Sequence, residues 1–261
     1  MTDYLYPNEH VVALARLQAL EQIEDACTLE QLITLGVGAG WNCLEIGAGA
    51  GSIAYWLADQ VGKEGRVVAT DVQPHLLDSE RCEVWRHDIV EDALPPQTFD
   101  LAHMRHVLIH VPQEQHERIF SKVLSTLKPG GVLLVEESDF STWQVDAGTP
   151  EPLRSTCEQG IQDVLWVYAE RGMDVRLGQH LGALAKRVGF QVTRMTRRAR
   201  TVVGGSAEAR FHQISFQQLA ASLTQTHPPV AAKVARLGEC LEDPRLSYRT
   251  RTTIAVSAER A

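Results

Sequence analysis

One glycine-rich segment carries residue types that bind nucleotide-like ligands. Gly47, Ala48, Gly49 and Gly51, followed by Ser52, stand between a short apolar run and a helical pattern. Glycine lets the backbone approach a ligand closely, and the helix beyond offers unpaired N–H groups at its N-terminus. The segment therefore indicates a ligand-binding turn, although a glycine loop alone is also compatible with a purely structural turn.

Two acidic residues follow this loop at the ends of predicted strands. Asp71 ends the second strand 20 residues after Gly51, where a carboxylate accepts hydrogen bonds from both ribose hydroxyls. Asp88 ends the third strand, where a carboxylate accepts a bond from an exocyclic adenine amine. Ligands of open α/β sheets bind at the carboxyl ends of the strands, so the loop and both acids are expected at one site. For either acid alone, a solvated loop residue is the alternative.

The spacing around the loop separates two kinds of nucleotide ligand. The glycines form GxGxG, and Ser52 stands where a dinucleotide-binding turn has Gly or Ala. Glu45 precedes the loop by two residues, and a buried carboxylate there repels a pyrophosphate but suits a ligand with an amine or sulfonium group. An NAD-dependent oxidoreductase, which shares the loop and the acid, remains as a disfavoured alternative.

Histidines after the fourth predicted strand are the candidates for proton transfer. His106 and His110, in His-Val-Leu-Ile-His, are spaced i, i+4 and are expected to share a helical face at the mouth of the site. The alternative is a pair of loop histidines that hold backbone groups. No third ligand follows at a useful spacing, so no metal site is expected, and His103 is expected to pack on the strand.

Alternating strands and helices must position these residues. Apolar periodicity predicts a helix over 9–35, then strands at 41–46, 66–71, 83–88, 99–104 and 132–137, with helices at 52–61 and from Pro112 onward. Such alternation predicts parallel βαβ units in a doubly wound α/β sheet with helices on both faces. Beyond it we expect helices at 153–171 and 177–188, a strand at 190–203, two further helices and a final strand at 250–257.

Composition narrows the partners and the compartment. The chain has 261 residues, 44% hydrophobic residues and a formal net charge of −8, which suits one or two globular domains and disfavours a nucleic-acid partner. No apolar run approaches ~18 residues and no secretory signal is visible, so no membrane partner is expected. Five scattered cysteines without a CxxC motif favour the reducing cytoplasm. A homodimer and a monomer both remain open.

Five segments resemble a known superfamily when they are taken together in order. They are Leu44–Gly51, Val67–Asp71, Arg86–Ile89, Phe99–Met104 and Leu127–Val135. They are similar to the motifs of class I S-adenosylmethionine-dependent methyltransferases, closest to bacterial small-molecule enzymes of the ubiquinone/menaquinone type and their natural-product relatives. The resemblance is good over residues 1–137 and loose beyond them.

The resemblance implies a Rossmann-like methyltransferase fold. It has a mostly parallel seven-stranded sheet whose last strand inserts antiparallel, N-terminal helices, and a helical insertion after the fifth strand. We expect a single domain over 1–261. Its parts would be an N-terminal helical cover (1–40), a cofactor-binding core (41–137), a helical lid or substrate cover (139–178) and a C-terminal part that completes the sheet (179–261).

The resemblance also implies the residues of the cofactor site. Glu45 and the glycine backbone would lie near the methionine moiety, Asp71 at the ribose, Asp88 and the Ile89 backbone at adenine, and Arg105 near the methionine end. The N-terminal segment would fold over the cofactor. The expected set is Tyr6, Glu45, Gly47, Ala48, Gly49, Gly51, Ser52, Asp71, Val72, Asp88, Ile89 and Arg105.

The function implied is methyl transfer from S-adenosylmethionine, with S-adenosylhomocysteine as product, to an oxygen or carbon of a small-molecule metabolite. The alternatives are a methyltransferase-like protein that uses the cofactor structurally, as in a cyclisation, and a non-catalytic protein. Motifs of base-amine and magnesium-dependent catechol enzymes are missing, so both are disfavoured.

Several further side chains have a functional and a structural interpretation. Glu136, Glu137 and Asp139 would lie near the sulfonium or be solvated acids, while Trp143, Trp166 and Tyr168 would line an acceptor pocket or belong to the core. A cluster of arginines would bind an anion or form a solvated strand face; its members are Arg194, Arg197, Arg198 and Arg200.

Overall fold

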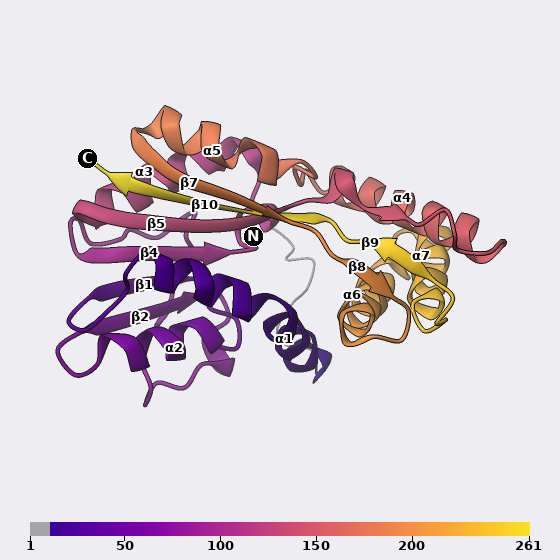
Figure 1. The fold of residues 1–261 in the computed structure, drawn as a ribbon, viewed down its shortest axis with the longest axis horizontal. Coiled ribbons are helices and arrows are strands. Elements are labelled where there is room, and N and C mark those ends of the chain that lie inside the picture. Colours follow the sequence, from indigo (N-terminus) through magenta and orange to yellow (C-terminus); the bar gives the residue numbers. More distant parts are fainter. Residues whose placement is uncertain (1–10) are drawn as a thin grey trace. The chain divides into compact units, whose positions relative to one another are not determined.

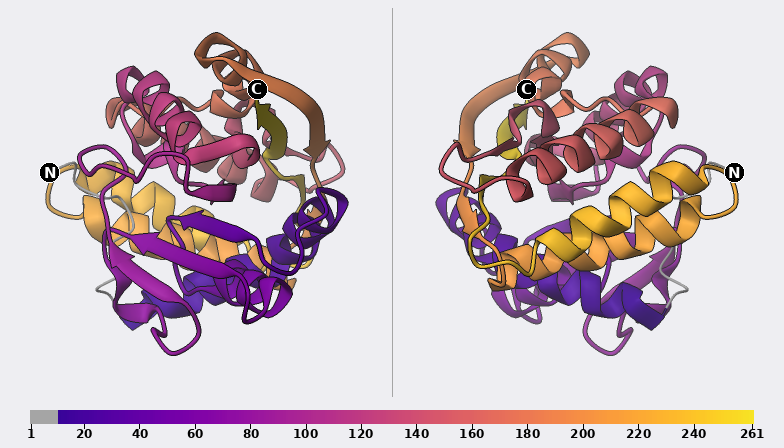
Figure 2. Two further views of the ribbon diagram at one scale, coloured as in Figure 1. Left: turned by 90° about the vertical axis from the view of Figure 1, so that its left-hand side faces the viewer. Right: turned by 90° about the vertical axis from the view of Figure 1, so that its right-hand side faces the viewer.

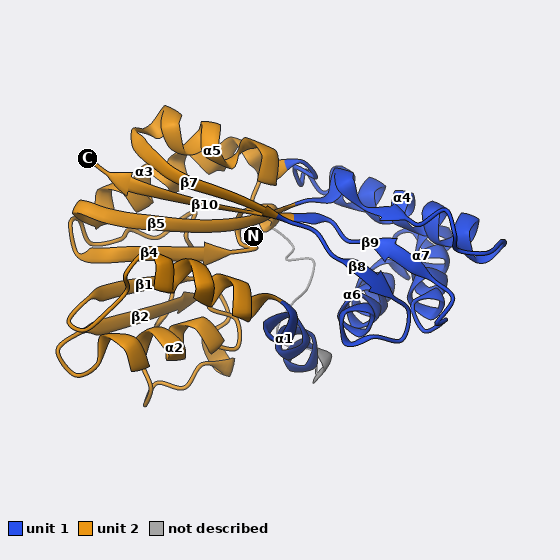
Figure 3. Cartoon of the chain, in the orientation of Figure 1, with its two compact units in different colours: residues 1–23, 139–176, 198–252 blue, residues 24–138, 177–197, 253–261 orange. Residues whose placement is uncertain are grey.

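The computed structural model describes residues 11–261 and divides into two compact units (Figure 3). The sheet unit comprises Glu24–Ser138, Leu177–Arg197 and Thr253–Ala261. The helical unit comprises the described residues 11–23 together with Asp139–Arg176 and Arg198–Thr252. The chain passes between the units several times, so neither unit is one continuous segment.

A seven-stranded sheet forms the centre of the sheet unit, in the order β3-β2-β1-β4-β5-β10-β7 (Figure 1). The strands are β1 (Asn42–Ile46), β2 (Arg66–Asp71), β3 (Glu83–Arg86), β4 (Phe99–Arg105), β5 (Leu127–Asp139), β7 (Phe190–Arg198) and β10 (Thr252–Arg260). The first five are joined by parallel pairings. The last strand, β10, lies between β5 and β7 and runs opposite to β4, so the α/β fold and the inserted final strand are both confirmed.

Helices cover both faces of this sheet because the two halves wind in opposite directions. In one half, α2 (Ser52–Val61) connects β1 to β2. In the other, α3 (His116–Thr126) connects β4 to β5, and α5 (Leu177–Val188) precedes β7 and packs on α3. Right-handed crossovers put α2 on one face and α3 on the other. The second half of α1 (Val11–Thr34) shares the α2 face, where Leu32 packs with Leu57 and Leu134.

The prediction of one strand over 190–203 is wrong, because the chain forms two strands there. β7 belongs to the large sheet, whereas β8 (Thr201–Val203) joins β9 (Ser247–Arg249) and β6 (Gln144–Val145) in a three-stranded antiparallel sheet. At the break, the Thr250 N–H donates to the Arg200 carbonyl and the Arg200 N–H donates to Thr250 Oγ1. No Gly or Pro marks the break, so the sequence pattern gave no sign of it.

Two other predicted boundaries differ from the structure. The helix expected from Pro112 begins at His116, after two short 3₁₀ turns, η2 (Leu108–His110) and η3 (Gln113–Gln115). The expected final strand 250–257 is β10, which continues to Arg260. A further pair of 3₁₀ turns, η1 (Pro74–Leu76) and η4 (Phe140–Thr142), completes the short elements.

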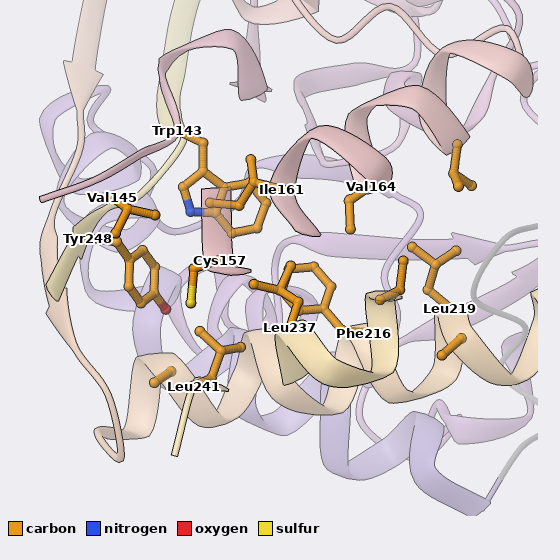
Figure 4. Packing of buried hydrophobic residues seen from close by; sticks show 14 of the residues in the cluster. Trp143, Val145, Cys157, Ile161, Val164, Phe216, Leu219, Leu237, Leu241 and Tyr248 are labelled. Atoms are coloured by element: carbon orange, nitrogen blue, oxygen red, sulfur yellow. The ribbon is translucent and has the colours of Figure 1, made fainter. Parts of the chain in front are cut away.

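Three helices pack together in the helical unit. They are α4 (Leu153–Glu170), α6 (Ala207–Leu223) and α7 (Pro228–Cys240). Figure 2 shows α6 and α7 side by side, and α7 also packs against α4. Figure 4 shows the core between them, where Trp143, Phe216 and Leu237 meet. Trp143 and Tyr168 are buried in this core, whereas Trp166 is 43% exposed. The assignment of residues 139–178 as a substrate cover stays a prediction.

None of the helices in the described part of the chain is long and apolar enough to cross a membrane.

The contact between α4 and α7 depends on Gly160. A Cβ there would lie 2.7 Å from Leu237 Cβ, which is closer than real Cβ contacts allow. We expect Gly160→Ala to lower the free energy of unfolding by about 1–3 kcal/mol, the usual cost of overpacking. Gly148→Ala is the matched control, since a Cβ there meets nothing within 4 Å. Urea titration followed by circular dichroism measures both, and equal stabilities of the two variants would contradict this account.

Candidate active site

The glycine loop links β1 to α2 in a conformation that only glycine adopts easily. Gly47, Gly49 and Gly51 have φ of +68°, +58° and +95°. A Cβ at Gly47 would lie 2.5 Å from Val107 Cγ2, and one at Gly51 would lie 2.4 Å from the Tyr55 ring. The backbone angle therefore explains all three glycines, and close packing adds a second reason at Gly47 and Gly51. The N-terminus of α2 follows directly at Ser52.

Asp71 holds this loop against the end of β2. Its carboxylate accepts hydrogen bonds from the Gly49 N–H (3.1 Å) and the Gln73 N–H (2.9 Å), while the Ala48 N–H donates to the Thr70 carbonyl. Burial raises the pKa of Asp71, partly offset by these backbone donors. A carboxylate has about four acceptor positions, so these two backbone bonds leave room for ligand hydroxyls.

The segment expected at adenine is held from α3. Lys122 Nζ donates to the carbonyl oxygens of Ile89 (2.6 Å), Val90 (3.1 Å) and Asp92 (2.5 Å). Asp88 accepts from the Val90 N–H at 2.9 Å through Oδ1, so its side chain also shapes the turn. Val72, beside Asp71, is 41% exposed and presents an apolar surface at the carboxyl end of β2.

A row of charged side chains crosses three strands on the face that α1 and α2 cover. Glu45 of β1 and His103 of β4 are register partners, and so are Arg105 of β4 and Glu136 of β5. His103 Nδ1 lies 2.7 Å from Glu45 Oε2, and His103 Nε2 lies 3.3 Å from Glu136 Oε2. All three of these side chains are almost wholly buried. His103 does lie on the strand as expected, but it is ion-paired rather than simply packed.

The row continues into α1. Thr28 Oγ1 donates to Glu136 Oε2 at 2.6 Å and accepts from Arg105 Nη1 at 2.8 Å. Arg105 Nη2 donates to Asp25 Oδ1, also at 2.8 Å. Asp25, Thr28 and Leu32 follow the spacing of one helical face, so this stripe of α1 meets the row. The predicted place of Arg105 near a methionine moiety stays a prediction.

The charges in this row alter one another. Burial by itself would lower the pKa of His103, but Glu45 and Glu136 raise it to about 9. Burial would raise the pKa of Glu136, yet His103, Arg105 and Thr28 hold it below its usual value. His103 and Glu136 are therefore ionised near neutral pH. Removing one member of such a buried set commonly costs about 3–5 kcal/mol.

The expectation that His106 and His110 share a helical face is wrong. His106 follows β4 with a φ of +56°, and His110 ends the short 3₁₀ turn η2. A non-glycine residue in this backbone region is strained, and such strain often accompanies function. His106 Nδ1 lies 3.9 Å from Glu137 Oε2. The pair thus forms part of a loop, not of a helix.

Two buried side chains hold this loop in place. Glu137 Oε1 accepts from the Leu108 N–H at 2.7 Å. His116 Nε2 lies 3.0 Å from both the Leu108 and Val111 carbonyl oxygens, so that nitrogen must carry the proton. The interpretation of Glu136 and Glu137 as solvated acids is wrong, because both are 0–1% exposed and engaged within the fold. Asp139 is also buried and caps η4 through the Ser141 N–H.

Other predicted residues lie away from this row or outside the described part. Tyr6 lies outside the described residues. Arg200 pairs with Glu208 at 3.2 Å, whereas Arg194 and Arg197 are exposed on β7, an edge strand, where charge blocks further strand pairing. No group of three or more potential metal ligands occurs among residues 11–261.

Sequence reasoning missed the ionic row and the supports of the loop. His103, Glu136 and Thr28 lie far apart in the chain, and only strand register brings them together. The one available signal is the alternation of His103 and Arg105 with the apolar residues Ala102 and Met104 in the second half of the strand. Charged residues at alternate positions of a buried parallel strand need partners on the same face.

Part of the chain is similar to known methyltransferases. Residues 43–131 match the family model described as a methyltransferase domain. Over 114 residues the chain is 32% identical to methyltransferase str3 of Strobilurus tenacellus, which covers 42% of this chain and 40% of that protein. Over 116 residues it is 28% identical to the tRNA N(3)-cytidine methyltransferase METTL2 of Gallus gallus, which covers 39% and 31%. The chain thus spans less than half the length of either relative.

Solved structures share the fold over most of the chain. A putative methyltransferase from Bacillus halodurans C-125 has a TM-score of 0.56 at 19% identity, covering 89% of this chain and 98% of that one. The [4+2]-cyclase SpnF has a TM-score of 0.50 at 20% identity, covering 85% and 76%. Residues 43–131 thus match a methyltransferase domain, and the described chain has the fold of class I S-adenosylmethionine-dependent methyltransferases. S-Adenosylmethionine is the cofactor of that class.

The charged row predicts a stability that falls in alkaline solution. The pKa of His103 is raised in the folded state, so its contribution is complete below the unfolded value of 6.5 and is lost as the pH rises through about 9. We expect a loss of up to about 3 kcal/mol between pH 6.5 and 10. The difference between wild type and His103→Gln, measured by urea titration at each pH, isolates this part.

The exposed His180 supplies the control for that measurement. His180→Gln should follow the wild-type pH dependence. A His103→Gln variant with the same alkaline slope as wild type would show that His103 is not the group responsible.

Proposed function

We propose that the protein transfers a methyl group from S-adenosylmethionine to an oxygen or carbon of a small-molecule metabolite. The observation that carries the proposal is the junction of three elements: the loop 47–51, Asp71 bonded to the Gly49 N–H, and Glu45 just before the loop. Such a junction suits a ligand with a ribose, which Asp71 would bind, and an amine, which Glu45 would bind. The glycine loop lets the backbone come close to that ligand.

The residues present fit this cofactor. Asp71 keeps acceptor positions beyond its two backbone bonds, and Glu45 uses only Oε2 in its bond to His103 among the described residues. Ribose hydroxyls would bind Asp71, the ammonium group would bind Glu45, and adenine would lie by Val72 and the Asp88–Ile89 segment. The bound cofactor would supply an electrophilic methyl group. The protein's own part is to orient the acceptor and remove its proton.

His106 is the proposed base for an acceptor hydroxyl or carbon acid. Its ring lies at the carboxyl end of β4, and the buried carboxylate of Glu137 stands 3.9 Å from Nδ1. A carboxylate on that side stabilises an imidazolium, so the His106 ring would take the proton as the methyl group is transferred. His110, on the same loop, is the second candidate.

The second proposed activity is a reaction such as a cyclisation, in which the protein binds the cofactor but does not consume it. The residues that hold the cofactor would be the same in both cases. Mass spectrometry of the reaction mixture distinguishes them, because methyl transfer produces S-adenosylhomocysteine and a product heavier by one methylene unit, whereas a cyclisation consumes no cofactor.

We also propose that the protein acts in the cytoplasm and has no nucleic-acid partner.

Calorimetric titration tests the cofactor assignment. We expect S-adenosylhomocysteine to bind and NAD not to bind. Asp71→Ala should weaken S-adenosylhomocysteine binding by about 1.5–3 kcal/mol, the scale of lost bonds to a charged group. Asp59→Asn is the control, since that side chain is 69% exposed on α2. Binding of NAD alone would exclude the proposed function, and an unchanged affinity in Asp71→Ala would remove Asp71 from the site.

Turnover measurements test the proposed base. We expect His106→Ala to reduce kcat by about 10²–10⁴, the usual contribution of a positioned base, while the Kd for S-adenosylhomocysteine stays within twofold. His110→Ala, assayed in parallel against a panel of small phenols, tests the second candidate. Full activity in both variants would exclude histidine base catalysis.

A further inference from the structure

His103 contacts two carboxylates at once and lies beyond the reach of solvent. Its side chain is 0% exposed, and those of Glu45 and Glu136 are 5% and 2% exposed. Both ring nitrogens face a carboxylate oxygen, at 2.7 Å and 3.3 Å. A neutral imidazole has one N–H, so one nitrogen would turn a lone pair toward a carboxylate oxygen. The geometry therefore favours the imidazolium form, in which both nitrogens donate.

Only one of the two carboxylate oxygens of Glu45 is bonded to His103. Oε2 is held by His103, and among the described residues no further bond to this carboxylate is formed. Glu45 is the next-to-last residue of β1 and stands two residues before Gly47, so the side chain that carries the second oxygen is attached beside the glycine loop. A carboxylate fixed at one oxygen loses little rotamer freedom when the other oxygen binds a ligand cation.

We propose that His103 is a positioning residue: as an imidazolium it holds Glu45 so that the second carboxylate oxygen binds the ammonium group of the ligand, without touching the ligand itself. This inference rests on the proposed function, because it takes the ligand to be an adenosyl amino acid.

Every element around His103 supplies groups that bear on its charge. Glu45 comes from β1, Glu136 from β5 and Arg105 from β4 itself. The helix α1 adds Thr28, Asp25 and Glu24 around Arg105. Cys43 lies two residues before Glu45, and burial raises the pKa of its thiol to about 12, so it remains neutral. Three carboxylates immediately bonded within the row outnumber its two cations, and this favours the imidazolium.

Two ligands separate positioning from simple structural support. S-Adenosylhomocysteine carries the ammonium group, whereas 5′-methylthioadenosine has the adenosine part without it. We expect His103→Gln to weaken binding of S-adenosylhomocysteine at least tenfold and to change binding of 5′-methylthioadenosine less than twofold. Glu45→Gln should do the same, and the double variant should lose no more than either single variant, because His103 acts through Glu45.

His212→Gln is the matched control. His212 is also a buried histidine, 3% exposed, but its ring lies at hydrogen-bond distance from Tyr248 Oη and Arg251 Nη1 in the helical unit. This variant should preserve the ratio of the two affinities. Equal weakening of both ligands in His103→Gln would overturn the proposal, since it would show a structural role alone.

A spectroscopic measurement keeps the test valid if His103→Gln does not fold. Nitrogen-15 NMR of the wild-type protein at pH 8 should show one imidazolium, and that signal should be lost or shifted in Glu45→Gln. A neutral His103 at pH 8 would overturn the proposal. If the wild-type protein binds neither ligand, the proposed function fails and this inference fails with it. If the wild-type protein binds both ligands and His103→Gln weakens them equally, this inference alone fails.

Discussion

The buried contact of His103 with Glu45 and Glu136 is the interaction on which the site depends. It joins three neighbouring parallel strands through side chains on one face, close to where those strands end. Burying charge in a sheet is expensive, and the cost is offset only where each charge has a partner at hydrogen-bond distance. The strand register that brings these partners together is therefore constrained, because a shift by one residue would move each charge to the opposite face.

The same interaction ties the site to α1. Thr28 bonds to Glu136 and Arg105, and Arg105 bonds to Asp25, so the helix is held by polar contacts as well as by Leu32 in the apolar cluster below. The opposite side of the β4 end is held differently. There Glu137 and His116 bond to backbone groups of the loop that carries His106. Adjacent residues of β5, Glu136 and Glu137, thus support the two sides of the site because strand side chains alternate.

The sequence predicts the features that depend on residues close together in the chain and misses those that depend on residues far apart. The loop at 47–51, Asp71 and the βαβ order rest on local spacing, and the structure has them where the pattern places them. The helical face assigned to His106 and His110 failed because i, i+4 spacing does not show whether the chain turns after β4. The prediction of one strand over 190–203 failed for a similar reason. The alternation typical of a strand continues where the chain passes from one sheet to the other, so the pattern does not show the change. His103 was seen only as a packed residue, because its partners are 58 and 33 residues away in sequence.

Charge balance explains why an acidic row suits the ligand that we propose. Glu45, Glu136 and Asp25 carry three negative charges against the positive charges of His103 and Arg105, so one negative charge is left over. Arg105 is bonded to Thr28 and Asp25 at the α1 end, whereas the Glu45 end borders the glycine loop. Arg105 is thus already paired at the α1 end, and the remaining negative charge would be balanced at the Glu45 end by the group that the loop binds. An ammonium or sulfonium group completes that balance, whereas a pyrophosphate would place two like charges beside Glu45 in a medium of low dielectric constant.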